Sequence, residues 1–485
     1  MATLSDQDIE AIARKIVADI GGGAAAAKPS PQPAAASSAP PPVSGMGIFD
    51  TIDEAITAAR AAFPVFSALP LETRNRIIAN IRQTMREHKT ALAKSAHEET
   101  GLGRFEDKIV KNELVIEKTP GTEALHPDAR TGDRGLTLTE PAPYGVIGAI
   151  TPCTNPTSTI INNSIGMLAA GNAVVFNVHP ASKRCSMETI VLLNKAITAA
   201  GGPQNVVVGV GNPTVESAQE LMKHPGIRIL VVTGGGGVVK AAMASGKRAI
   251  CAGPGNPPVV VDETANIAQA GRDIVLGAST DNNIICADEK EVVVVDSVAD
   301  SLLKSMVQNG AALIDKSKLA ALEQVIFTKM AGPRGHAEIN RKWIGKNADL
   351  ILREIGMNVP STIRLGVIEV DVDHPLMWTE QMMPILPVAR VKDADKAIDL
   401  GLEMEGKCYH TAIMHSMHLG RLSRMARECN CSIFVKNGRS QAGLGLGGEG
   451  HTSFTIASPT GEGMTSPISF SRWRRCTLVD HFRIV

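Results

Sequence analysis

The stretch VIGAITPCTNP, residues 146–156, is the clearest indicator of the fold class. Its first five residues form an unbroken apolar run, and a loop with two prolines then leads into helical periodicity at 159–170. This order continues along the chain, with further strands expected at 173–176, 205–208 and 227–232, and helices at 186–199 and 214–224. Strict alternation of strands and helices implies right-handed crossovers, so the pattern predicts an α/β fold with a mostly parallel sheet.

Other segments extend this pattern in both directions. Two helical segments, 52–62 and 71–89, precede the series, and a second series of strands and helices begins at Pro258. Two such series predict a two-lobed α/β enzyme.

Composition excludes several classes of protein. The chain has 485 residues, a length typical of about three domains. Lys and Arg together number 49, as do Asp and Glu, so no overall field attracts nucleic acid or anionic lipid. Eight cysteines without regular spacing or a secretory signal favour free thiols in the cytoplasm. No apolar run reaches 18 residues, so we expect no membrane span.

The N-terminus differs in composition from the rest of the chain. Residues 4–20 carry apolar side chains three or four apart with charges between them, which predicts one amphipathic helix. Residues 21–42 consist largely of Gly, Ala, Pro and Ser and are expected to be a linker. The helix either binds another molecule or docks on its own subunit, and the residues favour neither reading.

Cys286 is the candidate nucleophile. It stands in the stretch TDNNIICADEK, residues 280–290, and the strongly β-prone run EVVVV follows at 291–295. A thiol just before a strand is well placed at the mouth of a site. A glycine-proline run, GPGNPP, lies about thirty residues earlier at 253–258.

Two loops in the first series suggest a nucleotide site. The strand at 227–232 runs into Thr233, Gly234 and Gly235 and then a helix, which presents free backbone amides to a pyrophosphate. A plain tight turn is the alternative. The loop from Thr151 lies at a strand's carboxyl end, where Asn155 offers amide donors to an oxyanion or simply forms a turn.

Together these motifs resemble the aldehyde dehydrogenase superfamily, and within it the branch that makes acyl-CoA, over residues 46–475. The shared motifs, in the family's order, are Pro152, Asn155 and Pro156, then Thr233 and Gly234, then Cys286, then TEQMMPILPV at 379–388. The resemblance implies that Asn155 and the Cys286 amide form the oxyanion hole and that Glu380 holds the nicotinamide ribose of NAD. It also implies cofactor-binding roles for Thr151, Pro152, His179, Thr233, Gly234 and Gly235.

The resemblance further implies a domain plan. It consists of a Rossmann-like cofactor domain at 46–255 with a β arm near 130–142, and an α/β catalytic domain at 256–440. Residues 441–485 then return to the cofactor domain and form a C-terminal oligomerisation arm, while 1–20 and 21–45 are a targeting helix and its linker. Arms at 135–140 and 473–485 would make a homodimer or homotetramer.

One departure from the hydrolytic family members concerns the second half-reaction. Those enzymes carry a glutamate that activates water, but the corresponding residues 250–258 (ICAGPGNPP) contain no carboxylate. Without a general base water attacks a thioester slowly, whereas the thiol of coenzyme A ionises near neutral pH. We therefore expect the acyl enzyme formed on Cys286 to be released by coenzyme A. His179 follows the strand where many members have a lysine.

Other polar residues have ordinary explanations. The Cys153 side chain either lines the active-site pocket or packs near it. Cys251 is expected to contribute to packing only. Cys408, Cys429 and Cys431 are placed in a strand-rich region, with spacings too irregular for a metal site. His410 resembles a histidine usual in the acylating branch, although a structural role is favoured. Glu289 is expected to be a surface or ion-paired residue.

Substrate and location follow from composition and from the resemblance. Aromatic residues make up 3% of the chain, which suits a short aliphatic aldehyde. The tethered N-terminal helix resembles those that direct family members into bacterial microcompartments by binding shell proteins. This favours propionaldehyde oxidation in 1,2-propanediol breakdown, with acetaldehyde oxidation in ethanolamine breakdown as the alternative. A hydrolytic enzyme, a non-catalytic scaffold and histidinol-dehydrogenase-like chemistry are further alternatives.

Overall fold

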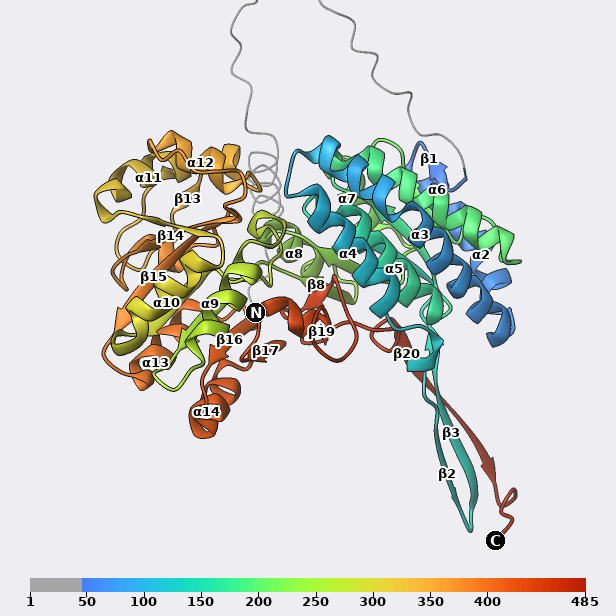
Figure 1. Ribbon diagram of the computed structural model, residues 1–485. Helices are drawn as coiled ribbons and strands as arrows, with labels where there is room; N and C mark the ends of the chain where they lie inside the picture. Colours follow the sequence, from blue (N-terminus) through green and yellow to red (C-terminus); the bar gives the residue numbers. More distant parts are fainter. Residues whose placement is uncertain (1–45) are drawn as a thin grey trace, which may run out of the picture.

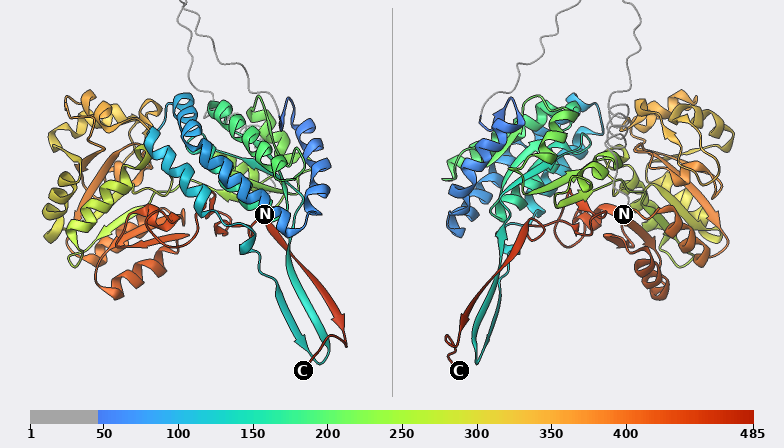
Figure 2. Two further views of the ribbon diagram at one scale, coloured as in Figure 1. Left: turned by 45° about the vertical axis from the view of Figure 1, so that its right-hand side comes forward. Right: turned by 180° about the vertical axis from the view of Figure 1, so that it is seen from behind.

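The structure, a computed structural model, describes residues 46–485, so the expected helix and linker at 1–45 lie outside it. It forms two lobes and a long arm that projects away from them (Figures 1 and 2). Each lobe is built around one parallel sheet with helices on its faces. The predicted α/β class is therefore confirmed.

The first lobe contains a six-stranded sheet in the order β1-β6-β5-β4-β7-β8. Its strands are β1 (Ile48–Phe49), β4 (Val146–Ile150), β5 (Ala173–Asn177), β6 (Val207–Val210), β7 (Ile229–Thr233) and β8 (Ala249–Ala252), all parallel. The helices are α2 (Ile52–Ser67), α3 (Leu71–Thr100), α4 (Phe105–Lys118), α5 (Pro156–Ala169), α6 (Lys183–Ala199), α7 (Val215–Lys223) and α8 (Gly236–Met243). Strands β4 and β5 are buried along their whole length, as expected for strands covered on both faces.

The second lobe contains a seven-stranded sheet in the order β11-β14-β15-β10-β9-β16-β17. Its strands are β9 (Pro258–Val261), β10 (Glu291–Val295), β11 (Ala311–Ile314), β14 (Leu365–Glu369), β15 (Ile385–Val391), β16 (Thr411–His415) and β17 (Ile433–Lys436). The helices are α9 (Ile267–Ala278), α10 (Asp296–Gln308), α11 (Leu319–Ile326), α12 (Ala348–Glu354), α13 (Ala394–Met404) and α14 (Leu419–Cys429). Two short antiparallel pairs, β12 (Phe327–Lys329) with β13 (Glu338–Ile339) and β18 (Ile456–Ala457) with β19 (Gly463–Met464), complete the chain's small elements.

The arm is a three-stranded antiparallel sheet. It joins β2 (Asp128–Gly132), β3 (Gly135–Pro143) and β20 (Ser471–Val479), so that segments far apart in sequence lie side by side (Figure 1). Strands were expected at 135–140 and 473–485. The second one ends at Val479, because Asp480 and Phe482 have positive φ angles that turn the chain out of the sheet.

The predicted strands and helices are present, and their boundaries differ for local reasons. The strand expected at 205–208 is β6 at 207–210, because Asn205 has a φ of 65° and turns the chain just before it. Helix α5 begins three residues early at Pro156, since proline suits the first helical position. Cys429 was wrongly placed among strands and instead ends helix α14. Among residues 46–485 no helix is long and apolar enough to cross a membrane.

Candidate active site

Cys286 lies in a loop between the 3-10 turn Thr280–Asn283 and strand β10, and it is partly exposed. The three residues 281–283 all have φ between 45° and 66°, the left-handed region. Asp and Asn tolerate that conformation better than other side chains because they bond to nearby backbone. The sequence DNN therefore allows a tight reversal directly before the nucleophile.

Side chains hold this reversal on both sides. The Lys290 ammonium donates to the carbonyl and side-chain oxygens of Asn283, at 2.8 and 2.6 Å, and to the Ile285 carbonyl at 3.2 Å. The Asn283 amide donates in turn to the Ala278 and Glu289 carbonyls, both at 2.8 Å. A fully buried lysine so bonded fixes the backbone on which Cys286 sits.

Glu289 is a correction to the sequence interpretation. Its side chain is fully buried, and its two oxygens accept hydrogen bonds from the backbone amide and hydroxyl of Ser440, each at 2.8 Å. Burial raises the pKa of Glu289 to about 7. It is thus neither a surface residue nor one held by an ion pair. It joins the nucleophile loop to the segment after β17.

The environment of Cys286 makes its thiol a weak acid. Burial raises the pKa of Cys286 to about 12, the negative charge of Glu380 acts in the same direction, and Lys290 opposes them. In the cofactor-free protein the thiol is therefore protonated at neutral pH. Its activation as a nucleophile requires a positive charge or a proton acceptor close by.

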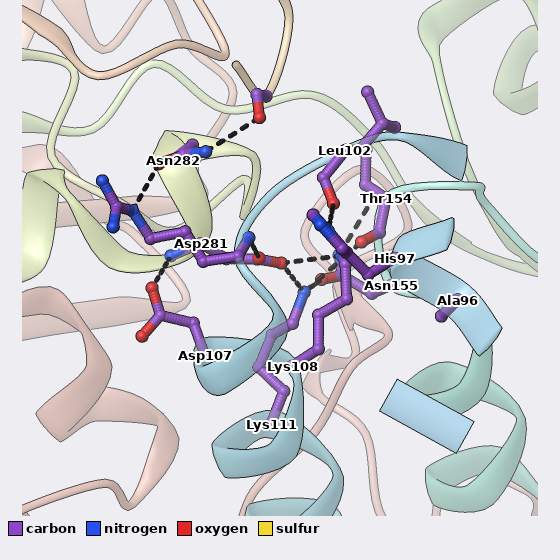
Figure 3. A network of polar contacts seen from close by, with 12 residues as sticks. Ala96, His97, Leu102, Asp107, Lys108, Lys111, Thr154, Asn155, Asp281 and Asn282 are labelled. Atoms are coloured by element: carbon purple, nitrogen blue, oxygen red, sulfur yellow. Dashed lines mark hydrogen bonds and ion pairs between the residues drawn. The ribbon is translucent and has the colours of Figure 1, made fainter. Parts of the chain in front are cut away.

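Asn155 is held by a buried ionic network (Figure 3). It follows the loop after β4, and its side-chain oxygen accepts a hydrogen bond of 2.5 Å from the Lys111 ammonium. Lys111 also pairs with Asp281, the first residue of the left-handed stretch, and Lys108 pairs with the same carboxylate at 3.1 Å. The network thus ties the Asn155 loop, helix α4 and the nucleophile loop together.

The residues expected to bind the cofactor gather at one edge of the first sheet. Thr151 and Pro152 follow β4, His179 follows β5, and Thr233, Gly234 and Gly235 lie at the end of β7. These three strands are neighbours in the order β5-β4-β7 and run parallel, so their carboxyl ends meet at the same edge. Ligands of open α/β sheets bind at such an edge.

Local features of this edge fit a dinucleotide. A Cβ atom at Gly235 or Gly236 would meet nothing within 4 Å, so the backbone at the start of α8 is open to approach. The Thr151 hydroxyl is buried and has no hydrogen-bond partner within residues 46–485. Such an orphaned donor points to a ligand. His179 is half-buried, and its Nδ1 accepts from the Ala181 amide, so its other ring nitrogen is available.

Glu380 and His410 both lie close to Gly255. The Gly255 amide donates to the Glu380 carboxylate. A Cβ at Gly255 would lie 2.7 Å from the Cys286 carbonyl oxygen and 2.9 Å from Cγ of His410, so only glycine fits there. Gly255 therefore packs against the backbone carbonyl of Cys286, and the run 253–258 contains no carboxylate.

His410 is fully buried and neutral. Burial lowers its pKa to about 4, and its Nδ1 lies 2.8 Å from the Thr411 hydroxyl. Its Nε2 has no partner within the described part of the chain. Beside a nucleophile, an unpartnered imidazole nitrogen can accept a proton. The sequence favoured a purely structural role and gave no sign of this orphan atom.

A cavity of about 230 Å³ opens beside Ile285, the residue before Cys286, but neither Cys286 nor Asn155 lines it. Its lining mixes apolar residues, Leu114 and Phe454 among them, with charged ones such as Lys111 and Arg364. Cys153, half-buried in the loop before Asn155, does not line the cavity, and Cys251 is buried in β8.

Sequence reasoning missed Lys108, Lys111 and the 439–454 segment. The three-residue spacing of two lysines on one helix face was the only available signal. Across residues 46–485 no group of three His, Cys, Asp or Glu side chains could hold a metal.

Comparisons with known proteins agree with this geometry. The model of the aldehyde dehydrogenase family matches residues 49–457. Acetaldehyde dehydrogenase (acetylating) EutE of Salmonella typhimurium is 50% identical over 444 residues, which cover 91% of this chain and 94% of that protein.

Two solved structures are also similar. A propionaldehyde dehydrogenase from the Clostridium phytofermentans fucose utilisation bacterial microcompartment has a TM-score of 0.88 at 46% identity, covering 91% of this chain and all of that one. A Rhodopseudomonas palustris propionaldehyde dehydrogenase, with bound CoA and an acylated cysteine, has a TM-score of 0.87 at 47% identity, covering 90% and 98% of the two chains.

Proposed function

This chain belongs to the aldehyde dehydrogenase family and is a CoA-acylating member of it, and from that premise we propose that it oxidises propionaldehyde with NAD and coenzyme A to propionyl-CoA. The observation that carries the proposal is the contact of Gly255 with Cys286. At the position where a hydrolytic enzyme holds a water-activating glutamate, this chain packs a glycine run against the nucleophile. An acyl group on Cys286 is thereby left for a thiol.

The chemistry begins at Cys286, which attacks the aldehyde carbon. The Asn155 side-chain amide and the Cys286 backbone amide stabilise the oxyanion of the thiohemiacetal. Thr151, Pro152, His179, Thr233, Gly234, Gly235 and Glu380 would hold NAD. The bound cofactor would favour the Cys286 thiolate through its positive charge and would accept the hydride of the thiohemiacetal, which leaves a thioester on Cys286.

His410 serves the second half-reaction. As coenzyme A attacks the thioester, its thiol must lose a proton. His410, whose Nε2 has no partner within residues 46–485, packs near Gly255, and Gly255 lies against the Cys286 carbonyl. Burial lowers the pKa of His410 to about 4, so the imidazole is neutral at pH 7 and accepts the thiol proton only when the bound substrates raise that pKa. The acyl group leaves as acyl-CoA, and Cys286 is regenerated.

The small size of the cavity beside Ile285 supports a short substrate. Its volume of about 230 Å³ is below the roughly 300–1,000 Å³ of ordinary ligand pockets. Acetaldehyde is the second candidate, because EutE acts on acetaldehyde and is 50% identical to this chain.

Two further proposals concern assembly. Residues 1–20, outside the described part, would bind shell proteins and bring the enzyme into a bacterial microcompartment, where one of its structural relatives belongs. The β2-β3-β20 arm joins subunits into a dimer or tetramer. Its exposed apolar side chains, Trp473 and Val479 among them, support this role.

NADH formation by the purified protein tests the reaction. We expect it with propionaldehyde and NAD only when coenzyme A is present, with propionyl-CoA as the product identified by mass spectrometry. Acetaldehyde at matched concentrations gives the ratio of the two kcat/KM values. The Cys286→Ala variant is the control and should be inactive. Propionate formed without coenzyme A would refute the acylating mechanism, and an inactive wild-type protein would favour a scaffold.

A further inference from the structure

No step of the proposed reaction uses Lys111, although it is buried beside Asn155. It lies in helix α4, its side chain is 4% exposed, and it lines the cavity that also contains Ile285. Its ammonium contacts the Asn155 side-chain oxygen at 2.5 Å, the Thr154 carbonyl at 3.3 Å and the Asp281 carboxylate. All three partners are oxygen acceptors.

This contact determines which way the Asn155 amide points. A side-chain amide can be turned over by 180°, which exchanges its oxygen and its NH2 group. An ammonium group can only donate hydrogen bonds. It therefore binds the amide when the oxygen faces it and repels the amide when the NH2 group faces it. With the oxygen held by Lys111, the NH2 group makes one contact, to the Thr154 hydroxyl at 3.2 Å. It remains available to an oxyanion.

We propose that Lys111 is a positioning residue for the oxyanion hole: its ammonium group holds the Asn155 oxygen so that the amide NH2 faces the reacting carbonyl. The inference rests on the proposed function, since it concerns the Asn155 role in that reaction. The charged group also polarises the amide and strengthens it as a donor.

The surrounding charges support the same role. Lys108 and Lys111 both contact the Asp281 carboxylate, so two cations face one anion and leave one excess positive charge beside Asn155 (Figure 3). Asp107, which accepts from the Asp281 amide, is already paired with Arg364. An excess positive charge in a buried site stabilises a developing oxyanion.

The protonation of Lys111 gives the arrangement a pH dependence. Burial lowers the pKa of Lys111 to about 8, Asp281 and Asp288 oppose this, and Lys108 adds to it. As pH rises through about 8 the ammonium becomes an amine, which can accept a hydrogen bond from the Asn155 amide. The orientation of that amide is then no longer fixed. Activity should fall on the alkaline side although the Cys286 thiolate becomes more abundant.

The test compares two lysines on one helix face. Lys111→Met should lower kcat for aldehyde oxidation on the order of 10²-fold, the effect of losing one oxyanion donor, with little change in KM. Lys108→Met is the matched control, because Lys108 is equally buried and contacts Asp281 but not Asn155. It removes the excess positive charge but keeps the contact between Lys111 and the Asn155 oxygen, so its loss in kcat should be clearly smaller than that of Lys111→Met. Thermal unfolding of both variants measures their stability.

Two further measurements isolate the positioning role. Added to Asn155→Ala, the Lys111→Met substitution should cost no further activity, since both changes disable the same group. The wild-type alkaline limb near pH 8 should be absent in Lys111→Gln. Equal losses in the two Met variants or additive losses in the double variant would overturn the inference. If Lys111→Met does not fold, Lys111→Gln and Lys108→Gln are compared in its place. Coenzyme A dependence of the wild type tests the proposed function separately.

Discussion

At the level of single residues, the Cys286 thiol is protonated at neutral pH and therefore weakly nucleophilic in the protein without NAD. Burial raises the pKa of Cys286 to about 12, so the thiolate is scarce at neutral pH. As the pH rises toward that value, the thiolate becomes about tenfold more abundant with each pH unit. We therefore expect the rate of alkylation of Cys286 by iodoacetamide to rise steadily beyond pH 10. Mass spectrometry of the Cys286 peptide measures this rate. A plateau between pH 7 and 9 would show that the thiol is already ionised.

Among the secondary-structure elements, the arm has the clearest testable role. Both outer strands, β2 and β20, have an unpaired edge, and Trp473 and Val479 are exposed at 56% and 60%. The double substitution Trp473→Asp and Val479→Asp should shift the assembly to a smaller species in light scattering, with the circular dichroism of the lobes unchanged. Leu419→Asp, on the exposed start of α14, is the matched control. An unchanged mass in the arm variant would contradict the proposed role.

For the whole molecule, catalysis by the two lobes and targeting by the N-terminal segment should be separable. The site is assembled from residues between 107 and 454, so removal of residues 1–20 should leave kcat unchanged. The same deletion should abolish association with microcompartment shells, measured by co-purification with shell proteins. A fluorescent protein fused to residues 1–45 should gain that association. Shell association that survives the deletion would refute the targeting proposal.

Much of the fold was predictable because its signals are local. An apolar run such as 146–150 forms a strand wherever both faces are covered, and helices between such runs require parallel pairing. Cys286, Asn155 and Glu380 could be predicted as site residues because they stand in recognisable motifs. Lys111 was not, because its partners Asn155 and Asp281 are 44 and 170 residues away in sequence.

The chain's residues alone therefore established the α/β class, the resemblance to the family, and the lack of a carboxylate at 250–258. Folding established which groups face one another: Lys111 and Asn155, Gly255 and Cys286, and the unpartnered Nε2 of His410. It also established the pKa values, raised for Cys286 and lowered for Lys111 and His410. The physical reason is that motifs depend on neighbours along the chain, whereas burial and charge depend on neighbours in space, which long-range packing supplies.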